Sequence, residues 1–347
     1  MQAPELSARA AALAPPRAYG APPARGVLRA EPEDFVVEEE LGFPPADSGS
    51  HLLLKVRKRN ANTQWVAREL ARRAGCRPGE AGYAGLKDRR AVAVQWFSVP
   101  RPRTAVNWLE TPGADFEVLE VHAHTRKLPR GALAGNRFAV RILAPEGDGA
   151  ELSAHLAPRL AAIAQRGVPN YFGAQRFGRD AANLQRLAAP RRLAPRERGF
   201  VLSAARSVIF NALLAVRVTD GSWEQLRAGD VANLDGRGSV FRVDAIDAAL
   251  HERCRRLAIH ATGPLWGEGC PASDGEVREL ETAIAARYPE AAAACAAARM
   301  AQERRSLRLT VHELRCEVEA RAVRLRFRLA RGCFATAVLA ELIESVL

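Results

Sequence analysis

A single carboxylate among cations marks the segment of this chain that is best suited to chemistry. Asp88 follows Lys87 and precedes Arg89 and Arg90, in a short stretch that begins at Gly85. Neighbouring positive charge favours the ionised carboxylate, and the same cations attract a polyanion. Asp88 is therefore a candidate nucleophile or general base in a phosphate-attracting loop. From this segment alone, a structural turn aspartate paired with a neighbouring arginine is the competing interpretation.

A second candidate is the segment G-A-L-A-G-N-R-F at residues 131–138, which follows a basic run. Small residues permit close approach of the backbone to a ligand. Asn136 has the groups to read a base edge, and Phe138 the ring to stack on a base. The alternative is a turn into a strand that buries Phe138 in the core.

Two further segments carry candidate RNA contacts. Residues 170–178, N-Y-F-G-A-Q-R-F-G, interleave aromatic residues with glycines and Arg176. This pattern fits a base-stacking surface and a packed aromatic turn equally well. Residues 203–211 open a predicted helix that Ser203 would cap and on which Arg206 is polar; an ordinary amphipathic helix is the simpler reading.

Composition bounds the class of protein. The chain has 347 residues, enough for about two domains, and a net charge of +12 from 51 Lys and Arg against 39 Asp and Glu. Nucleic acid is the expected partner class. The alternative is that a gene of high GC content favours arginine codons and so raises the net charge. The six cysteines form no C-x-x-C, so reduced thiols in a cytoplasmic protein are expected.

Several classes of site and location are not expected. The opening lacks a secretory signal, and we find no continuous apolar stretch long enough to span a bilayer. His122 and His124 would share a strand face, but no third metal ligand accompanies them, so two surface histidines are expected. No phosphate-binding or metalloprotease motif occurs. We therefore expect neither a metal nor an organic cofactor, and no membrane association.

The elements that must position these residues mix strands and helices without strict alternation, which predicts an α+β fold with a mixed or largely antiparallel sheet. Residues 1–25 are expected to form a loosely ordered tail. Thr63 is the expected cap of the first helix. The clearest strand is 323–329, which alternates apolar residues with arginines. Other predicted strands are 35–37, 52–56, 92–99, 116–121 and 138–143, and predicted helices are 63–74, 151–166 and 334–346.

Together the motifs resemble one family. Residues 26–35, 83–91, 126–138, 170–178, 202–206 and 332–336 match, in order, the pattern of TruD-type tRNA pseudouridine synthases. The A-G-x-K-D and N-Y-F-G-x-Q-R-F-G motifs are highly specific. The matches extend over nearly the whole chain.

The resemblance implies an isomerase that converts a uridine of tRNA, at position 13 in bacterial members, to pseudouridine without a cofactor. By its place in the motif, Asp88 would be the catalytic aspartate. It would either attack the ribose C1′ or remove a C2′ proton to give a glycal. Arg29 matches the basic residue thought to pair with this aspartate. Phe35, Asn136 and Phe138 match positions that line the same pocket.

The family architecture implies a pseudouridine synthase catalytic domain from residues 26–167 and 306–347, with an inserted α/β domain at 168–305. A cleft between these domains would hold tRNA, with Arg176 and Arg206 as candidate contacts. Pairing of Arg29 with Asp88 would leave Lys87, Arg89 and Arg90 to support the loop or meet phosphate. A monomer is the expected state.

Two other functions compete with the enzyme. An RNA-binding protein or chaperone would use the same surface without chemistry. A DNA-binding regulator fits worst, because no helix-turn-helix is visible. The combination of Asp88 with Arg29, Asn136 and Phe138 favours the enzyme.

Overall fold

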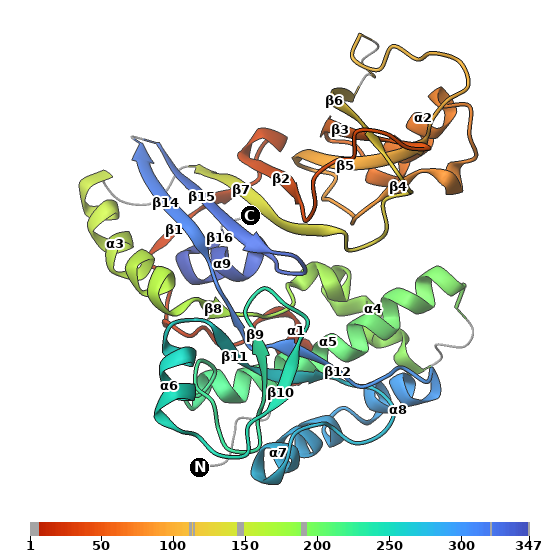
Figure 1. Cartoon of the computed structure of the whole chain (residues 1–347). Helices are drawn as coiled ribbons and strands as arrows, with labels where there is room; N and C mark the ends of the chain where they lie inside the picture. Colours follow the sequence, from red (N-terminus) through yellow and green to blue (C-terminus); the bar gives the residue numbers. More distant parts are fainter. Residues whose placement is uncertain are drawn as a thin grey trace. The chain divides into compact units, whose positions relative to one another are not determined.

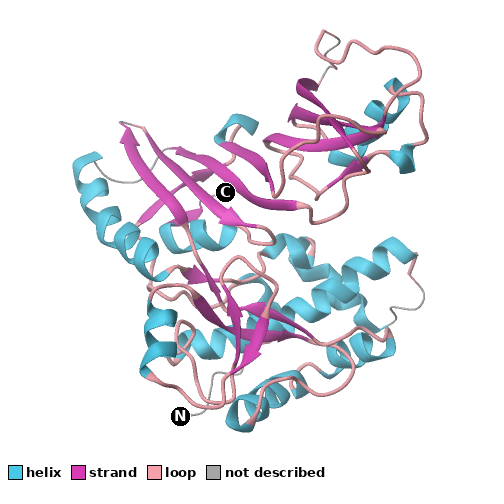
Figure 2. Cartoon of the chain, viewed as in Figure 1, coloured by secondary structure: helices cyan, strands magenta, loops and turns pink. Residues whose placement is uncertain are grey.

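Two compact units make up the computed structural model, which describes residues 7–110, 113, 115–143, 149–188, 193–319 and 321–345. Unit 1 comprises residues 1–22, 161–310 and 334–342, and unit 2 comprises residues 23–160, 311–333 and 343–347. Strands dominate unit 2, whereas helices make up more of unit 1 (Figures 1 and 2). The α+β prediction is therefore confirmed.

Unit 2 is built on one large mixed sheet. Within the described residues its strands follow the order β14-β15-β7-β2-β5-β3-β6, with β1 beside β7, β16 beside β1 and β4 beside β5. Most neighbours are antiparallel, but β2 pairs with β5 in parallel and so does β1 with β16. The bounds are β1 Ala24–Leu28, β2 Phe35–Leu41, β3 His51–Arg59, β4 Gly82–Tyr83, β5 Val92–Pro100, β6 Phe116–His124, β7 Leu133–Leu143, β14 His312–Glu319, β15 Ala322–Ala330 and β16 Ile343–Ser345.

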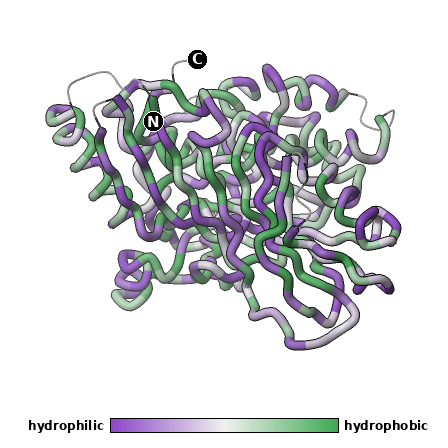
Figure 3. Tube along the Cα trace, turned by 90° about the horizontal axis from the view of Figure 1, so that it is seen from above, coloured by the Kyte–Doolittle hydropathy of each residue, from purple (hydrophilic) through white to green (hydrophobic). Residues whose placement is uncertain are grey.

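The period-2 pattern at residues 323–329 forms the middle of β15, as predicted. Val323, Leu325, Phe327 and Leu329 are buried on one face, whereas Arg324 and Arg326 are exposed on the other. Figure 3 shows how hydrophilic and hydrophobic residues are interspersed along the chain. A one-residue slip would invert every side chain, so this pattern holds the register of β15 on β7.

Helix α2, Thr63–Arg73, packs against β5 in unit 2. Val66, Ala67 and Leu70 are buried in one cluster with Leu54 and Val56 of β3. The expectation that Thr63 caps this helix is wrong. Asn62 is the cap, with its side-chain oxygen accepting from the Gln64 amide at 2.9 Å, and the Thr63 hydroxyl has other partners.

Unit 1 centres on the long helix α5, Pro195–Thr219, which packs against α1, α4, α7 and α8. A four-stranded sheet of order β10-β9-β11-β12 and the short pair β13-β8 complete its described strands. The bounds are α1 Ala8–Leu13, α4 Ala182–Gln185, α6 Ala248–Arg255, α7 Gly275–Ala286, α8 Pro289–Ala297, α9 Ala335–Leu342, β8 Val168–Pro169, β9 Val231–Leu234, β10 Val240–Arg242, β11 Ile259–Leu265, β12 Glu303–Ser306 and β13 Arg308–Leu309. Helix α3, Gly149–Arg166, contains Pro158.

By length and composition, residues 197–219 of α5 would suffice to cross a bilayer, although Arg206 and Arg217 interrupt their apolar run. About two thirds of this stretch is buried inside the protein. A core helix of a soluble protein has the same character, so this feature is weak evidence for a membrane.

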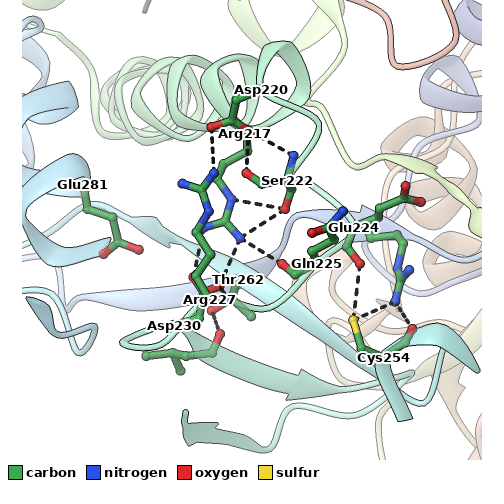
Figure 4. Close-up of polar contacts among 12 residues, drawn as sticks. Arg217, Asp220, Ser222, Glu224, Gln225, Arg227, Asp230, Cys254, Thr262 and Glu281 are labelled. Carbon is green, nitrogen blue, oxygen red and sulfur yellow. Dashed lines mark hydrogen bonds and ion pairs between the residues drawn. The ribbon is translucent and has the colours of Figure 1, made fainter. Parts of the chain in front are cut away.

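A buried ion pair ties the end of α5 to the loop before β9. The Arg217 guanidinium binds both oxygens of Asp230 at 3.0 and 3.2 Å (Figure 4). The same group donates to the carbonyls of Ser222 and Gln225. Arg217 and Asp230 are 2% and 0% exposed, so each charge depends on the other for compensation.

Three local predictions differ from the structure. In the part of residues 1–25 that is described, Ala8–Leu13 form helix α1 with Ala11 and Ala12 buried, rather than a loose tail; residues 1–6 lie outside the described residues. Ser203 lies inside α5 and not at its start. The last helix ends at Leu342, and Ile343 continues as a strand because it pairs with β1; residue 346 lies outside the described part.

The division into units and the predicted domain edges do not coincide everywhere. Residues 334–342 group with unit 1, as do residues 161–167. The domain boundaries at 168 and 305 stay a prediction.

Candidate active site

The loop that carries Asp88 connects two neighbouring strands of unit 2. Residues 84–91 leave β4, which pairs antiparallel with β5, and return to Val92 at the start of β5. Asp88, Arg89 and Arg90 are exposed at its tip, whereas Ala84 and Ala91 are buried at its ends. The loop therefore presents its carboxylate to solvent from anchored ends.

Arg29 and Asp88, distant in sequence, form an ion pair. One guanidinium nitrogen of Arg29 lies 3.0 Å from an Asp88 carboxylate oxygen. The Arg29 guanidinium also lies 4.0 Å from the centre of the Phe35 ring. Arg29 has a φ of 59°, which L-residues rarely adopt and which costs about 1 kcal/mol or more. Its ion pair and its aromatic neighbour hold the side chain in this unusual setting.

Aromatic rings line one face of the sheet beside this pair. Phe35 of β2 meets Phe138 of β7 edge to face, with ring centres 6.0 Å apart. Phe138 also stacks on Phe327 of β15 at 5.3 Å. The registers that bring them together place Val37 opposite Phe138 and Phe138 opposite Phe327. Phe35 and Phe138, both predicted for the pocket, thus lie together.

Asn136 lies on the same face of β7, two residues before Phe138. It is only 7% exposed, and its side-chain carbonyl oxygen has no hydrogen-bond partner among the described residues. A buried acceptor without a donor is costly, and such groups commonly meet a ligand or water. Its opposite neighbours are Glu39 on β2 and Leu329 on β15.

The three cations around Asp88 have different surroundings. Lys87 lies 2.6 Å from Glu39, and the two side chains are 10% and 1% exposed. Glu39 also accepts from the Trp96 amide at 2.9 Å. Lys87 therefore anchors the loop to β2. Arg89 and Arg90 are exposed, and Arg89 donates to the Asn60 carbonyl at 3.4 Å.

Sequence reasoning missed the support beneath the loop. The buried Lys58 ammonium donates to the carbonyls of Ala61 and Asp88 at 2.8 and 2.9 Å. Burial lowers the pKa of Lys58 to about 8. A signal was present: Leu54 and Val56 alternate inward, so period 2 places Lys58 inside as well.

The Thr63 hydroxyl is a second support. It accepts from the Lys87 amide at 3.1 Å and donates to the Gln95 side-chain oxygen at 2.9 Å. Gln95 in turn donates to the Gly85 carbonyl at 3.3 Å. These neutral groups fix the arm of the loop that leaves β4.

Arg176 and Arg206, the other RNA-binding candidates, both lie in unit 1. Arg176 donates to the Ser203 hydroxyl at 2.9 Å and lies over the Phe172 ring at 5.2 Å, and burial lowers its pKa. Arg206 pairs with Glu303 at 3.0 Å and donates to the carbonyls of Leu265 and Ala301. Both guanidinium groups thus already have partners within unit 1.

The aromatic residues of segment 170–178 belong to the core of unit 1. Tyr171, Phe172 and Phe177 are buried. The side chain of Asn211 on α5 is buried. Its oxygen accepts from the Phe172 amide, and its nitrogen donates to the Phe172 carbonyl. Of the two interpretations of this segment, the packed turn describes these rings, and a base-stacking surface does not.

The two histidines of β6 have different surroundings. His122 lies 3.0 Å from Glu120, and His124 is buried and stacks on Phe43 at 5.2 Å. The expectation of two surface histidines is thus wrong for His124. Within the part of the chain that the structure describes, no three His, Cys, Asp or Glu side chains gather as metal ligands would.

This geometry suits chemistry on a planar, polar group. An exposed carboxylate paired with a guanidinium can act as nucleophile or base. Phe35 and Phe138 lie beside it but are buried, at 4% and 8% exposed, as the alternative interpretation expected for Phe138. Asn136 has an acceptor without a partner.

Comparison with known proteins gives consistent matches. The chain matches the family model described as tRNA pseudouridine synthase D (TruD) over residues 16–190 and 182–342. It is 44% identical over 338 residues to tRNA pseudouridine synthase D of Methylococcus capsulatus, covering 95% of this chain and 94% of the relative. It is also 44% identical over 343 residues to that of Pseudomonas aeruginosa, with the same coverage.

A solved structure has the same fold. The crystal structure of the putative tRNA pseudouridine synthase D (TruD) from Methanosarcina mazei matches with a TM-score of 0.70. It is 22% identical and covers 98% of this chain and 96% of its own. At this identity the likeness concerns the fold.

Proposed function

Because this chain belongs to the tRNA pseudouridine synthase D (TruD) family, we propose that it isomerises a uridine of tRNA to pseudouridine. The uridine at position 13 is the proposed target. The observation that carries the proposal is the Arg29–Asp88 pair beside Phe35 and Phe138, on a loop with the family motif. The reaction moves the glycosidic bond of the base from N1 to C5. Uridine and pseudouridine are isomers with the same overall oxidation state, so the reaction needs no redox cofactor.

Asp88 carries the chemistry in this proposal. In one route its carboxylate attacks the ribose C1′, the bond from C1′ to N1 breaks, and an ester forms. In the other it removes a C2′ proton as that bond breaks, which leaves a glycal. In both, the base turns and C5 bonds to C1′. The ester bond from C1′ to Asp88 breaks as this happens in the first route, and in the second the proton returns from Asp88 to C2′. N1 takes up a proton, and the C5 proton is lost to complete the isomerisation.

The target nucleotide must leave its stack before Asp88 can reach C1′. The edge of Phe138 and the ring of Phe35 would then contact the extruded base. Phe138 has no hydroxyl, so the loss of the C5 proton requires another base. Arg29 would hold the Asp88 carboxylate in position through its ion pair.

Asn136 would recognise the base edge. A side-chain amide offers one acceptor and two donors, which complement the N3–H and an adjacent carbonyl of uracil. The unpartnered oxygen of Asn136 supports this role, because binding uracil would satisfy it.

The remaining RNA contacts would be electrostatic. The net charge of +12 favours a polyanion, and the exposed Arg89 and Arg90 directly follow Asp88. Arg176 and Arg206 are weaker candidates, since their donors already have partners. We also propose a monomeric protein in the cytoplasm.

The direct test is to incubate the purified protein with unmodified tRNA and map pseudouridine by carbodiimide-blocked reverse transcription. We expect one stop at the D-arm uridine for the wild type and none for Asp88→Asn, which keeps the size of the side chain. Asp47→Asn, an exposed aspartate in another loop of unit 2, is the matched control and should retain activity.

The outcomes separate the competing functions. An inactive wild type that still binds tRNA would favour an RNA-binding protein without chemistry. An active Asp88→Asn variant would leave the activity standing but remove Asp88 as its catalytic group.

A further inference from the structure

Lys58 is a fully buried cation directly beneath the proposed catalytic loop. It is 0% exposed near the end of β3. Its ammonium donates to the Asp88 carbonyl and to the Ala61 carbonyl at the start of the turn into α2. Burying a lysine is costly, and such a residue usually pairs with a carboxylate.

Its neighbours on β3 show what an ordinary cation does on this strand. Lys55 pairs with Glu38 and Glu120, Arg57 with Glu117, and Arg59 with Glu33, all at the surface. Among the described residues no carboxylate lies within ion-pair distance of the Lys58 ammonium. Its charge is instead held against two backbone carbonyls.

The turn after Lys58 holds the loop at further points. The Asn60 amide donates to the Ala91 carbonyl at 3.1 Å, and Arg89 donates to the Asn60 carbonyl. The Thr63 hydroxyl accepts from the Lys87 amide. Of these contacts between described residues, only that of Lys58 joins a charged group to the backbone of Asp88 itself.

Three charged groups surround the Lys58 ammonium. Asp88 and Glu39 favour its protonated form, whereas Lys87 and burial oppose it, and burial is the largest of these influences. The pKa of Lys58 is consequently lowered to about 8. Its charge therefore changes within the pH range in which tRNA enzymes can be assayed.

We propose that Lys58 is a positioning residue for the proposed reaction: its ammonium fixes the Asp88 peptide and keeps a positive charge beneath the attacking carboxylate. The inference rests on the proposed function of Asp88. Lys58 is buried and has no access to substrate, so its role would be to hold Asp88 in position.

The matched variants are Lys58→Met, which keeps length and apolar volume but removes the charge, and Arg57→Met, which removes a charge from the adjacent exposed position. Single-turnover pseudouridine formation with saturating enzyme would be followed from pH 6.5 to 9.5. Filter binding would give the Kd for tRNA. Hydrogen exchange would report the amides of residues 84–91 without reference to activity.

For Lys58→Met we expect a rate lower by about tenfold or more at pH 7, an unchanged Kd, and faster exchange in residues 84–91. Arg57→Met should keep the wild-type rate and exchange. The wild-type rate should fall towards that of Lys58→Met as the pH rises through about 8. Lys58→Arg, which stays charged, should exceed Lys58→Met in rate at pH 9.

As the pH rises, the wild-type rate should fall, but the stability of the wild type relative to Lys58→Met should rise. In the unfolded chain Lys58 keeps its proton to its ordinary pKa of 10.5, but in the folded chain it loses it near 8. Between these values the unfolded state binds more protons, so the wild type gains stability relative to Lys58→Met as the pH rises. A purely structural lysine would make rate and stability rise or fall together.

A Lys58→Met rate within twofold of wild type, or unchanged exchange in residues 84–91, would overturn the proposal. So would a loss of rate matched by an equal loss of tRNA affinity. A wild type without activity would instead refute the proposed function, while faster loop exchange in Lys58→Met would still support the anchoring by Lys58.

Discussion

At the scale of single residues, Arg29 combines two constraints. Its guanidinium pairs with Asp88 and lies over Phe35, while its backbone adopts a left-handed conformation. The sequence motif suggested the pair, and the structure shows the contact. The sequence does not show that the Arg29 backbone is strained, because its φ depends on how the chain leaves β1.

Replacing Arg29 by Ala and by Gly separates its side chain from its backbone. Both should slow pseudouridine formation by roughly tenfold or more, since a hydrogen bond between charged groups contributes about 1.5–3 kcal/mol. Binding of tRNA should change little. Gly adopts positive φ freely, so Arg29→Gly should be more stable to urea than Arg29→Ala by about 1 kcal/mol.

Arg25→Ala, on the exposed part of β1, serves as the control for lost charge. A loss confined to tRNA affinity in the Arg29 variants would contradict a role in orienting Asp88.

At the scale of elements, the turn into α2 does more than start a helix. Asn62 caps the helix, which leaves the Thr63 hydroxyl to bind the Lys87 amide in the Asp88 loop and Gln95. The sequence pattern predicted Thr63 as the cap, whereas the structure has Asn62. The tertiary packing of α2 behind the loop decided which one caps, because a buried hydroxyl must find its own partners.

Thr63→Val keeps the shape of the side chain but leaves the Lys87 amide and the Gln95 oxygen without this hydroxyl. We expect a loss of about 1–3 kcal/mol in the free energy of unfolding by urea, together with slower pseudouridine formation. Asn62→Ala should cost about 1 kcal/mol through the lost cap and leave the rate near wild type at temperatures where it is folded. Equal rates in the two variants would argue against the loop anchor.

At the scale of the whole molecule, the two units are stabilised differently. Unit 2 relies on a continuous sheet whose register follows hydrophobic alternation, as in β15. Unit 1 surrounds α5 with helices and includes the buried Arg217–Asp230 pair. Stability of unit 1 should therefore be sensitive to charges that lie far from Asp88 in sequence.

Arg217→Met should destabilise the protein by about 3–5 kcal/mol, because Asp230 would remain buried without its partner. The double variant Arg217→Met with Asp230→Leu should recover much of this loss. Urea unfolding followed by fluorescence measures both, and a double variant less stable than the single one would contradict the mechanism. The activity of folded Arg217→Met should stay near that of wild type.

Local sequence determined much of this protein. The A-G-L-K-D motif singled out Asp88, the alternation at 323–329 determined a strand, and the ordered motifs identified the family. Such features are local because the pleat of a strand and the spacing of a motif need only a few neighbouring residues. The roles predicted for Asn136 and Phe138 stay predictions, although both lie on the face of β7 that carries the aromatic contacts.

Only the tertiary structure decided what each charge and ring meets. It paired Arg29 with Asp88, bound Lys87 to Glu39, and buried Lys58 beneath the loop. It also packed Phe172 and Phe177 into the core of unit 1 rather than exposing them. These outcomes depend on contacts between segments far apart in the chain, and burial, which sets the energy of a charge or an aromatic ring, exists only once those segments have packed together.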